Sequence, residues 1–198
     1  MDIVQFLNGT EGKNIIEGIS AQTGINAHET SSVIQSAGPA LMGLLKNNAS
    51  NPQGAMGLLG ALKEHDGSVL DNIVGFLQGD ASQDGNAILG HIMGDKRNEI
   101  QTAISKDSGV SLASVQKILP LLAPIIMGFL GKQSKNNNVS TGGGLGDLLG
   151  GLLGGGGQQR SGNALGDILG GVLGGGNSGK KSGDGLLGGL KDMLGGKK

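Results

Sequence analysis

Residues 104–130 read ISKDSGVSLASVQKILPLLAPIIMGFL and carry the clearest signals for the fold. Ser111 is a typical N-cap residue. Apolar residues follow it at alternating steps of three and four, which predicts one face of an α-helix: Leu112, Val115, Leu119, Leu122, Ile126 and Phe129. Proline removes a backbone donor and disfavours helix at the residue before it. We therefore expect kinks or breaks at Pro120 and Pro124, and at Pro39 in a related segment.

That related segment is residues 19–45, which aligns with 104–130 at a constant offset of 85 and without a gap. Seven aligned pairs are identical: Ile19/Ile104, Ser20/Ser105, Gly24/Gly109, Pro39/Pro124, Met42/Met127, Gly43/Gly128 and Leu45/Leu130. We interpret residues of about 16–46 and 101–131 as an internal repeat. Each unit is predicted to be a helix that ends at the glycine, a tight turn and a second helix, which is a helix-turn-helix arrangement.

Helix signals also lie between the two units. Asn51-Pro52 combines an N-cap residue with proline at the first helical position. Gly67-Ser68 opens a segment of helical periodicity that continues to Leu77. No stretch alternates strictly between apolar and polar residues, as a half-buried strand would. The first 130 residues are therefore predicted to be all-α, with seven to nine short helices.

Composition excludes several classes of function. The chain of 198 residues has no cysteine, which removes disulfides, thiol nucleophiles and cysteine-ligated metals. Residues 1–141 carry nine Lys/Arg and twelve Asp/Glu, a charge of −3, whereas residues 142–198 carry six and four, a charge of +2. Neither part is basic enough to favour nucleic acid, and 2% aromatic residues provide few surfaces for base stacking.

The start of the chain lacks the basic and apolar regions of a signal peptide. The longest uncharged apolar run, residues 118–131, is too short to span a bilayer. We therefore expect a buried core segment there and a cytoplasmic bacterial protein.

Few residues suggest chemistry. Asp80 to Gly85 resembles the opening of a calcium loop, but position 12 of that loop is His91 rather than glutamate, so we interpret it as an inter-helix turn. His28 and His65 have no ligand-spaced partner, and we expect His91 to pack on an apolar helix face and bond a backbone carbonyl. We predict no catalytic, metal-binding or cofactor-binding residues, no cofactor, no small-molecule substrate, and no enzymatic activity.

Two strings suggest a family. Residues 85–94 read GNAILGHIMG, and residues 118–128 read ILPLLAPIIMG. With these strings, residues 1–132 resemble the bacterial YidB-like family, the domain of unknown function 937. The resemblance implies an all-helical, homeodomain-like fold and no established activity.

The C-terminal part has a different composition. Of 42 glycines, 24 lie in residues 142–198, which follow a polar linker at 133–141. This low-complexity tail holds aliphatic residues at helical spacing in two matching units: Leu145, Leu148, Leu149, Leu152 and Leu153, then Leu165, Ile168, Leu169, Val172 and Leu173. A looser third unit follows at residues 186–194. Because each glycine costs a helix up to about 1 kcal/mol relative to alanine, we expect a flexible tail whose short helices form only against an apolar surface.

These ten aliphatic residues are the predicted partner-binding residues. We expect a non-enzymatic interaction or scaffold protein that self-associates, as a homo-oligomer, or docks a protein partner through its leucine stripes. A solubilising, disordered tail is the bland interpretation. The alternatives are a DNA-associated protein that acts through residues 111–119, and a protein whose tail binds membrane surfaces.

Overall fold

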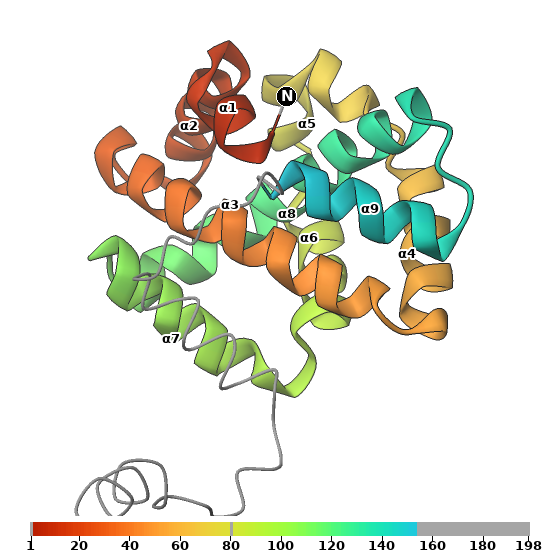
Figure 1. The fold of residues 1–198 in the computed structure, drawn as a ribbon. Helices are drawn as coiled ribbons and strands as arrows, with labels where there is room; N and C mark the ends of the chain where they lie inside the picture. The colour runs from red at the N-terminus through yellow and green to blue at the C-terminus, as the bar shows by residue number, and fades with distance from the viewer. Residues whose placement is uncertain (1, 80, 154–198) are drawn as a thin grey trace, which may run out of the picture.

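Side-chain N-caps mark where most of the described α-helices begin. The computed structural model describes residues 2–79 and 81–153, which form helices joined by short turns and contain no strand (Figure 1). The elements are α1 (Ile3–Asn8), α2 (Thr10–Thr23), α3 (Ala27–Ala49), α4 (Pro52–Glu64), η1 (Ser68–Asp71), α5 (Ile73–Leu77), α6 (Ala81–Met93), η2 (Gly94–Lys96), α7 (Arg97–Ser108), α8 (Leu112–Asn136) and α9 (Gly142–Leu152). The all-α prediction is confirmed for these residues.

Two helix pairs of this fold have matching boundaries. The α2–α3 turn and the α7–α8 turn both contain a left-handed glycine, with φ of 71° at Gly24 and 70° at Gly109. Helix α3 begins at Ala27 and α8 at Leu112, an offset of 85. The hydroxyls of Thr23 and Ser108, also 85 apart, each donate to the carbonyl four residues back and accept from the amide two residues on. The glycines end the first helices where the sequence predicts.

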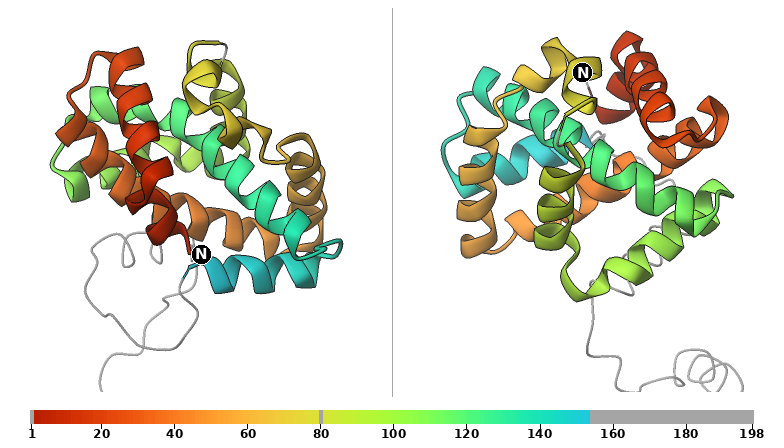
Figure 2. Two further views of the ribbon diagram at one scale, coloured as in Figure 1. Left: turned by 90° about the horizontal axis from the view of Figure 1, so that it is seen from above. Right: turned by 180° about the vertical axis from the view of Figure 1, so that it is seen from behind.

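Helix α8 is the core of the fold. Every residue from Ile118 to Gly131 is buried, and most of the other helices pack against α8, namely α2, α3, α4, α6, α7 and α9 (Figure 2). Among the described residues, α8 is the one helix long and apolar enough to cross a membrane, but 72% of its most apolar window is buried inside the protein. It is therefore the central helix of this fold, as the buried apolar run indicates.

Of the kinks or breaks predicted at proline, the breaks are wrong, because α3 and α8 continue through Pro39, Pro120 and Pro124. Helix α3 has 23 residues with Pro39 inside it, and α8 has 25 residues with Pro120 and Pro124 inside it. These helices are thus longer than the short helices expected. Burial on all sides stabilises α8 against the missing amide donors. Since Pro124 cannot donate to the carbonyl of Pro120, that carbonyl faces the backbone of Gly85 in α6 instead.

The single segment expected at 68–77 is also wrong in part. The 3₁₀ helix η1 and α5 are separated at Asn72, whose φ of −147° and ψ of 69° lie outside the helical range. The Asn72 side chain accepts a hydrogen bond from the amide of Gly75 and so caps α5. An internal N-cap residue outweighed the apolar periodicity here.

Candidate functional site

The most informative surface of the described residues is the groove that holds α9. This helix lies across α3, α4 and α8, with α3 and α4 beside it (Figures 1 and 2). Leu145 and Leu149 have 0% of their surface exposed and Leu152 has 7%. Leu148 and Leu153 are partly buried and pack against the same core. Half of the predicted partner-binding residues thus line one stripe in contact with their own domain.

A tight turn connects α8 to α9, which lies in this groove. The amide of Val139 donates to the carbonyl of Ser134 at 2.9 Å, and Asn138 adopts a left-handed φ of 52°. The Thr141 hydroxyl then caps α9 by accepting from the amide of Gly144 at 3.2 Å. Part of the predicted linker, residues 133–136, belongs to the last turn of α8. Residues 137–141 therefore form a defined connection between α8 and α9.

Glycines of α9 differ in what surrounds them. A Cβ on Gly142 would lie 3.0 Å from the Cβ of Ala55 in α4, so the first turn of α9 lies directly on α4. No atom lies within 4 Å of a Cβ placed on Gly143, Gly146 or Gly151. The groove thus requires a small residue at the start of α9 and has space for side chains further along it. Packing rather than helix propensity holds this segment in a helix.

The other five predicted partner-binding residues, from Leu165 to Leu173, lie outside the described residues.

The helix considered for DNA binding, residues 111–119, forms the start of α8. The Ser111 hydroxyl accepts from the amide of Ser114 at 3.1 Å, which confirms the predicted N-cap. Val115, Ile118 and Leu119 have no exposed surface. Gln116 and Lys117 are exposed, and the Gln116 amide donates to Gln101 in α7 at 3.4 Å. The apolar residues of this segment are therefore part of the core, and Lys117 is its one solvent-facing cation.

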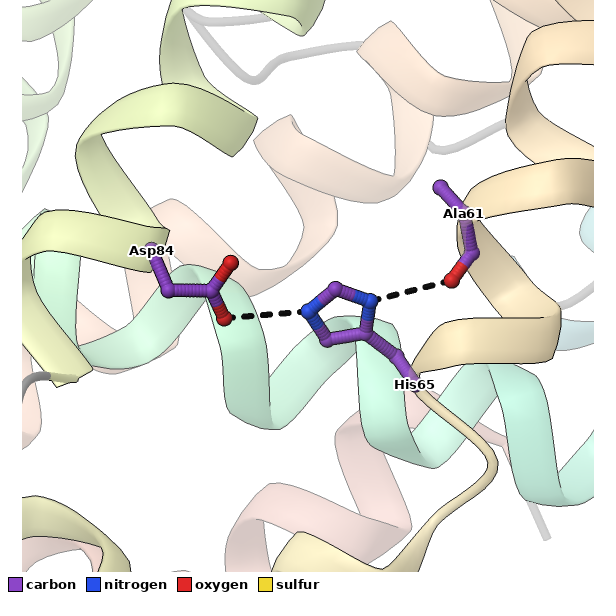
Figure 3. Close-up of polar contacts among 3 residues, drawn as sticks. All are labelled: Ala61, His65 and Asp84. Carbon is purple, nitrogen blue, oxygen red and sulfur yellow. Dashed lines mark hydrogen bonds and ion pairs between the residues drawn. The ribbon is translucent and has the colours of Figure 1, made fainter.

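A histidine–aspartate pair joins α4 to α6 (Figure 3). In His65, at the C-cap of α4, Nε2 lies 3.0 Å from Asp84 Oδ2, and Nδ1 lies 2.9 Å from the Ala61 carbonyl oxygen. Both neighbours are acceptors, so both ring nitrogens donate when the imidazole is protonated. Partial burial lowers the pKa of His65. The hydrogen bonds to Asp84 and Ala61 and the charges of Asp84 and Glu64 outweigh it and raise the pKa above 6.5.

This pair has the residue types of a catalytic dyad but not the geometry. A general base needs a ring nitrogen that can take a proton from a substrate. Both nitrogens of His65 are already bonded within the protein. A cavity of about 410 Å³ borders the pair, and its wall includes the exposed hydroxyl residue Ser68. The pair fits a structural link between two helices.

Two expectations about polar residues are wrong. His91 is exposed rather than packed on an apolar face, and it is His65 whose ring bonds a backbone carbonyl. Ala81 to Gly85 form the first turns of α6 instead of an inter-helix turn. The periodicity of α6 places its apolar stripe on Leu89 and Met93, which turns His91 outward. Within residues 2–79 and 81–153, no three His, Asp or Glu side chains gather as a metal site would require.

Comparison with known proteins agrees with the two sequence strings. The chain matches the family described as "Bacterial protein of unknown function (DUF937)" over residues 5–133. The match covers more than half of the 198 residues, and the chain belongs to this family. Helix α9 lies just beyond the matched region. No curated protein and no solved structure matches the chain.

Proposed function

From membership in a bacterial family of unknown function, and from the contacts of α9, we propose that this chain is a non-enzymatic interaction protein. Its Gly/Leu tail docks short leucine-striped segments on apolar surfaces, either of a second copy or of a partner protein. The observation that supports the proposal is the complete burial of Leu145 and Leu149 in the groove of α3, α4 and α8. The groove is thus the kind of apolar surface that such a stripe binds.

The later units supply the interaction. Leu165, Leu169 and Val172 have the spacing of Leu145, Leu149 and Leu152 and need an apolar surface for the same reason. A chain with several such stripes is multivalent, so weak contacts between copies add up. A cytoplasmic location suits this role and is part of the proposal.

The two helix pairs of matching boundaries support a homeodomain-like fold built from an internal repeat. In that fold the helix that starts at Ser111 would be the DNA-reading element. Lys117 is the one cation among residues 111–119, whereas binding a phosphate backbone calls for several. A DNA-associated function is therefore the alternative proposal. Binding of the tail to membranes is a third, supported by the lysines at 180, 181, 191, 197 and 198.

Sedimentation velocity across a concentration series tests the main proposal. At high concentration, we expect the full chain to sediment as species heavier than the 19.7 kDa monomer. A chain that ends at Gly157 keeps α9 and should remain monomeric. The Leu169→Asp variant is the matched control of full length, and it should weaken association.

Two further assays separate the alternatives. Monomers throughout the series, together with no capture of a partner by the tail, would contradict the proposal. A salt-dependent gel shift with specific DNA binding below micromolar would favour the DNA-associated function. Flotation with anionic vesicles tests the membrane alternative.

A further inference from the structure

The groove that holds α9 fits a second segment of the same chain. Residues 161–176 (SGNALGDILGGVLGGG) align with residues 141–156 (TGGGLGDLLGGLLGGG) at an offset of 20 and without a gap. Eleven of the sixteen aligned positions are identical by count: 142, 145, 146, 147, 149, 150, 151, 153, 154, 155 and 156. The cap is kept as well, because serine at 161 stands where Thr141 caps α9.

The contacts of α9 tolerate each difference between the two segments. Asparagine replaces Gly143, where no atom lies within 4 Å of a Cβ. Alanine replaces Gly144, where the Cβ would be 3.4 Å from the Thr141 hydroxyl oxygen, an ordinary contact. At the one position where α9 needs a small residue, Gly142, the second segment again has glycine, Gly162.

The effects of the remaining substitutions on binding to the groove nearly cancel. Isoleucine replaces Leu148, which is only partly buried, at equal side-chain volume. Valine replaces Leu152 and removes one buried methylene. Alanine at 164 favours helix over the glycine that it replaces. The intrinsic affinities of the groove for the two segments are thus similar.

Chain length then decides how often the second segment binds. Four residues, 137–140, connect α8 to the cap of α9, whereas 24 residues, 137–160, would connect α8 to Ser161. Effective concentration falls as about the −3/2 power of linker length, so the second segment is disadvantaged roughly 15-fold. A linker of this length still gives about millimolar effective concentration, which exceeds that of a second copy in dilute solution.

We propose that residues 161–173 bind the α9 groove of their own chain, in exchange with residues 141–153, in a minority of molecules. The inference rests on the proposed docking of leucine stripes. The exchange lets a partner take the first leucine stripe while the second keeps the core covered. It assigns to the groove of α3, α4 and α8 a second ligand, a capped Gly/Leu helix of the chain's own tail.

Disulfide trapping in the full chain tests the exchange, because the protein has no cysteine of its own. The Ala55→Cys, Gly142→Cys pair reports α9 in its groove. The two Cβ atoms would lie 3.0 Å apart, so a shift of a few tenths of an ångström brings them to the roughly 3.5–4.5 Å of a disulfide. The Ala55→Cys, Gly162→Cys pair reports the exchanged segment. The matched control is Ala55→Cys, Gln158→Cys, which is nearer along the chain but out of register. Non-reducing electrophoresis and peptide mass mapping give the yields.

We expect an intramolecular disulfide in all but the control, with the Gly162→Cys pair forming roughly 15-fold more slowly than the Gly142→Cys pair. Adding Leu149→Asp, which expels α9, should speed up the Gly162→Cys pair, and adding Leu169→Asp should abolish it. A Gly162→Cys yield no higher than that of the control would overturn the exchange. Disulfide-linked dimers would overturn the intramolecular exchange too, yet they would support self-association, so the two proposals can fail separately.

Discussion

Helices α8 and α9 both consist largely of small and aliphatic residues, yet they are helical for different reasons. Helix α8 is enclosed, with every residue from Ile118 to Gly131 buried, and it remains one helix despite two internal prolines. Helix α9 has six glycines among its eleven residues and is held along the single stripe of Leu145, Leu149 and Leu152. Enclosure makes α8 part of the global fold, whereas its one-sided contact leads us to expect that α9 opens at a lower free energy.

The largest predicted effect comes from the centre of α8. The ring of Phe129 stacks on Phe6 of α1 with centroids 4.4 Å apart, and both rings are buried. Phe129→Ala leaves a cavity and should lower the free energy of unfolding by about 3–5 kcal/mol. Chemical denaturation monitored by circular dichroism measures this loss. Val4→Ala in α1, at a side chain 51% exposed, is the control and should change stability little.

The next effect tests how closely α8 is enclosed. A Cβ on Gly85 would lie 1.6 Å from the carbonyl oxygen of Pro120, a backbone atom that cannot move alone. Gly85→Ala should therefore lower the free energy of unfolding by about 3 kcal/mol. Gly90→Ala, on the same helix with nothing within 4 Å, should instead raise it by about 0.5–1 kcal/mol. Equal effects of the two variants would mean that α6 does not approach α8 as described.

Helix α9 should respond to helix propensity, because its glycines are not enclosed. Gly146→Ala adds a methyl group where no atom lies within 4 Å and should stabilise α9 by about 1 kcal/mol. Gly142→Ala gains the same propensity but brings its Cβ to 3.0 Å from Ala55, so its benefit should be smaller. Local hydrogen exchange in α9 measures both. A larger benefit from Gly142→Ala would contradict the described contact with α4.

The smallest predicted effect is the pH dependence of the link between α4 and α6. The pKa of His65 is raised in the folded state, so the folded protein binds that proton more tightly than the unfolded chain. Its stabilisation is complete below pH 6.5 and is lost as the pH rises through the folded pKa. For a pair with Asp84 42% exposed, we expect less than about 1 kcal/mol.

Denaturation between pH 6 and pH 8 measures this slope in the free energy of unfolding. Asp84→Asn should flatten it, because the carboxylate that stabilises the imidazolium is gone. Asp66→Asn is the matched control, since Asp66 bonds the Ser68 amide rather than the imidazole and is ionised throughout this range. A slope that survives in Asp84→Asn would show that another group titrates.

Local signals in the sequence predicted most of the fold. Asn51-Pro52, Ser111 and the two left-handed glycines begin or end helices as expected, because caps depend on neighbouring residues alone. The breaks expected at proline are wrong, since whether a helix continues through proline depends on what surrounds it. The tertiary pairing of His65 with Asp84, 19 residues apart, had no local signal.

The surface that α9 binds could not be predicted from the sequence either, because it also depends on tertiary contacts. The leucine spacing predicts a stripe, and Leu145, Leu149 and Leu152 do form one. Its binding surface comes from α3, α4 and α8, which no periodicity in the tail can identify. The Thr141 cap was visible in the sequence as a threonine before a helical stripe and could have marked where α9 begins.

Residue-resolved hydrogen exchange of the full chain tests most directly whether the start of the Gly/Leu tail is part of the fold. We predict that the amides from Leu145 to Leu152 are protected well above free-peptide rates, at a lower opening free energy than the amides of α8. Exchange of these amides at free-peptide rates would contradict the docking of α9 and the functions proposed from it.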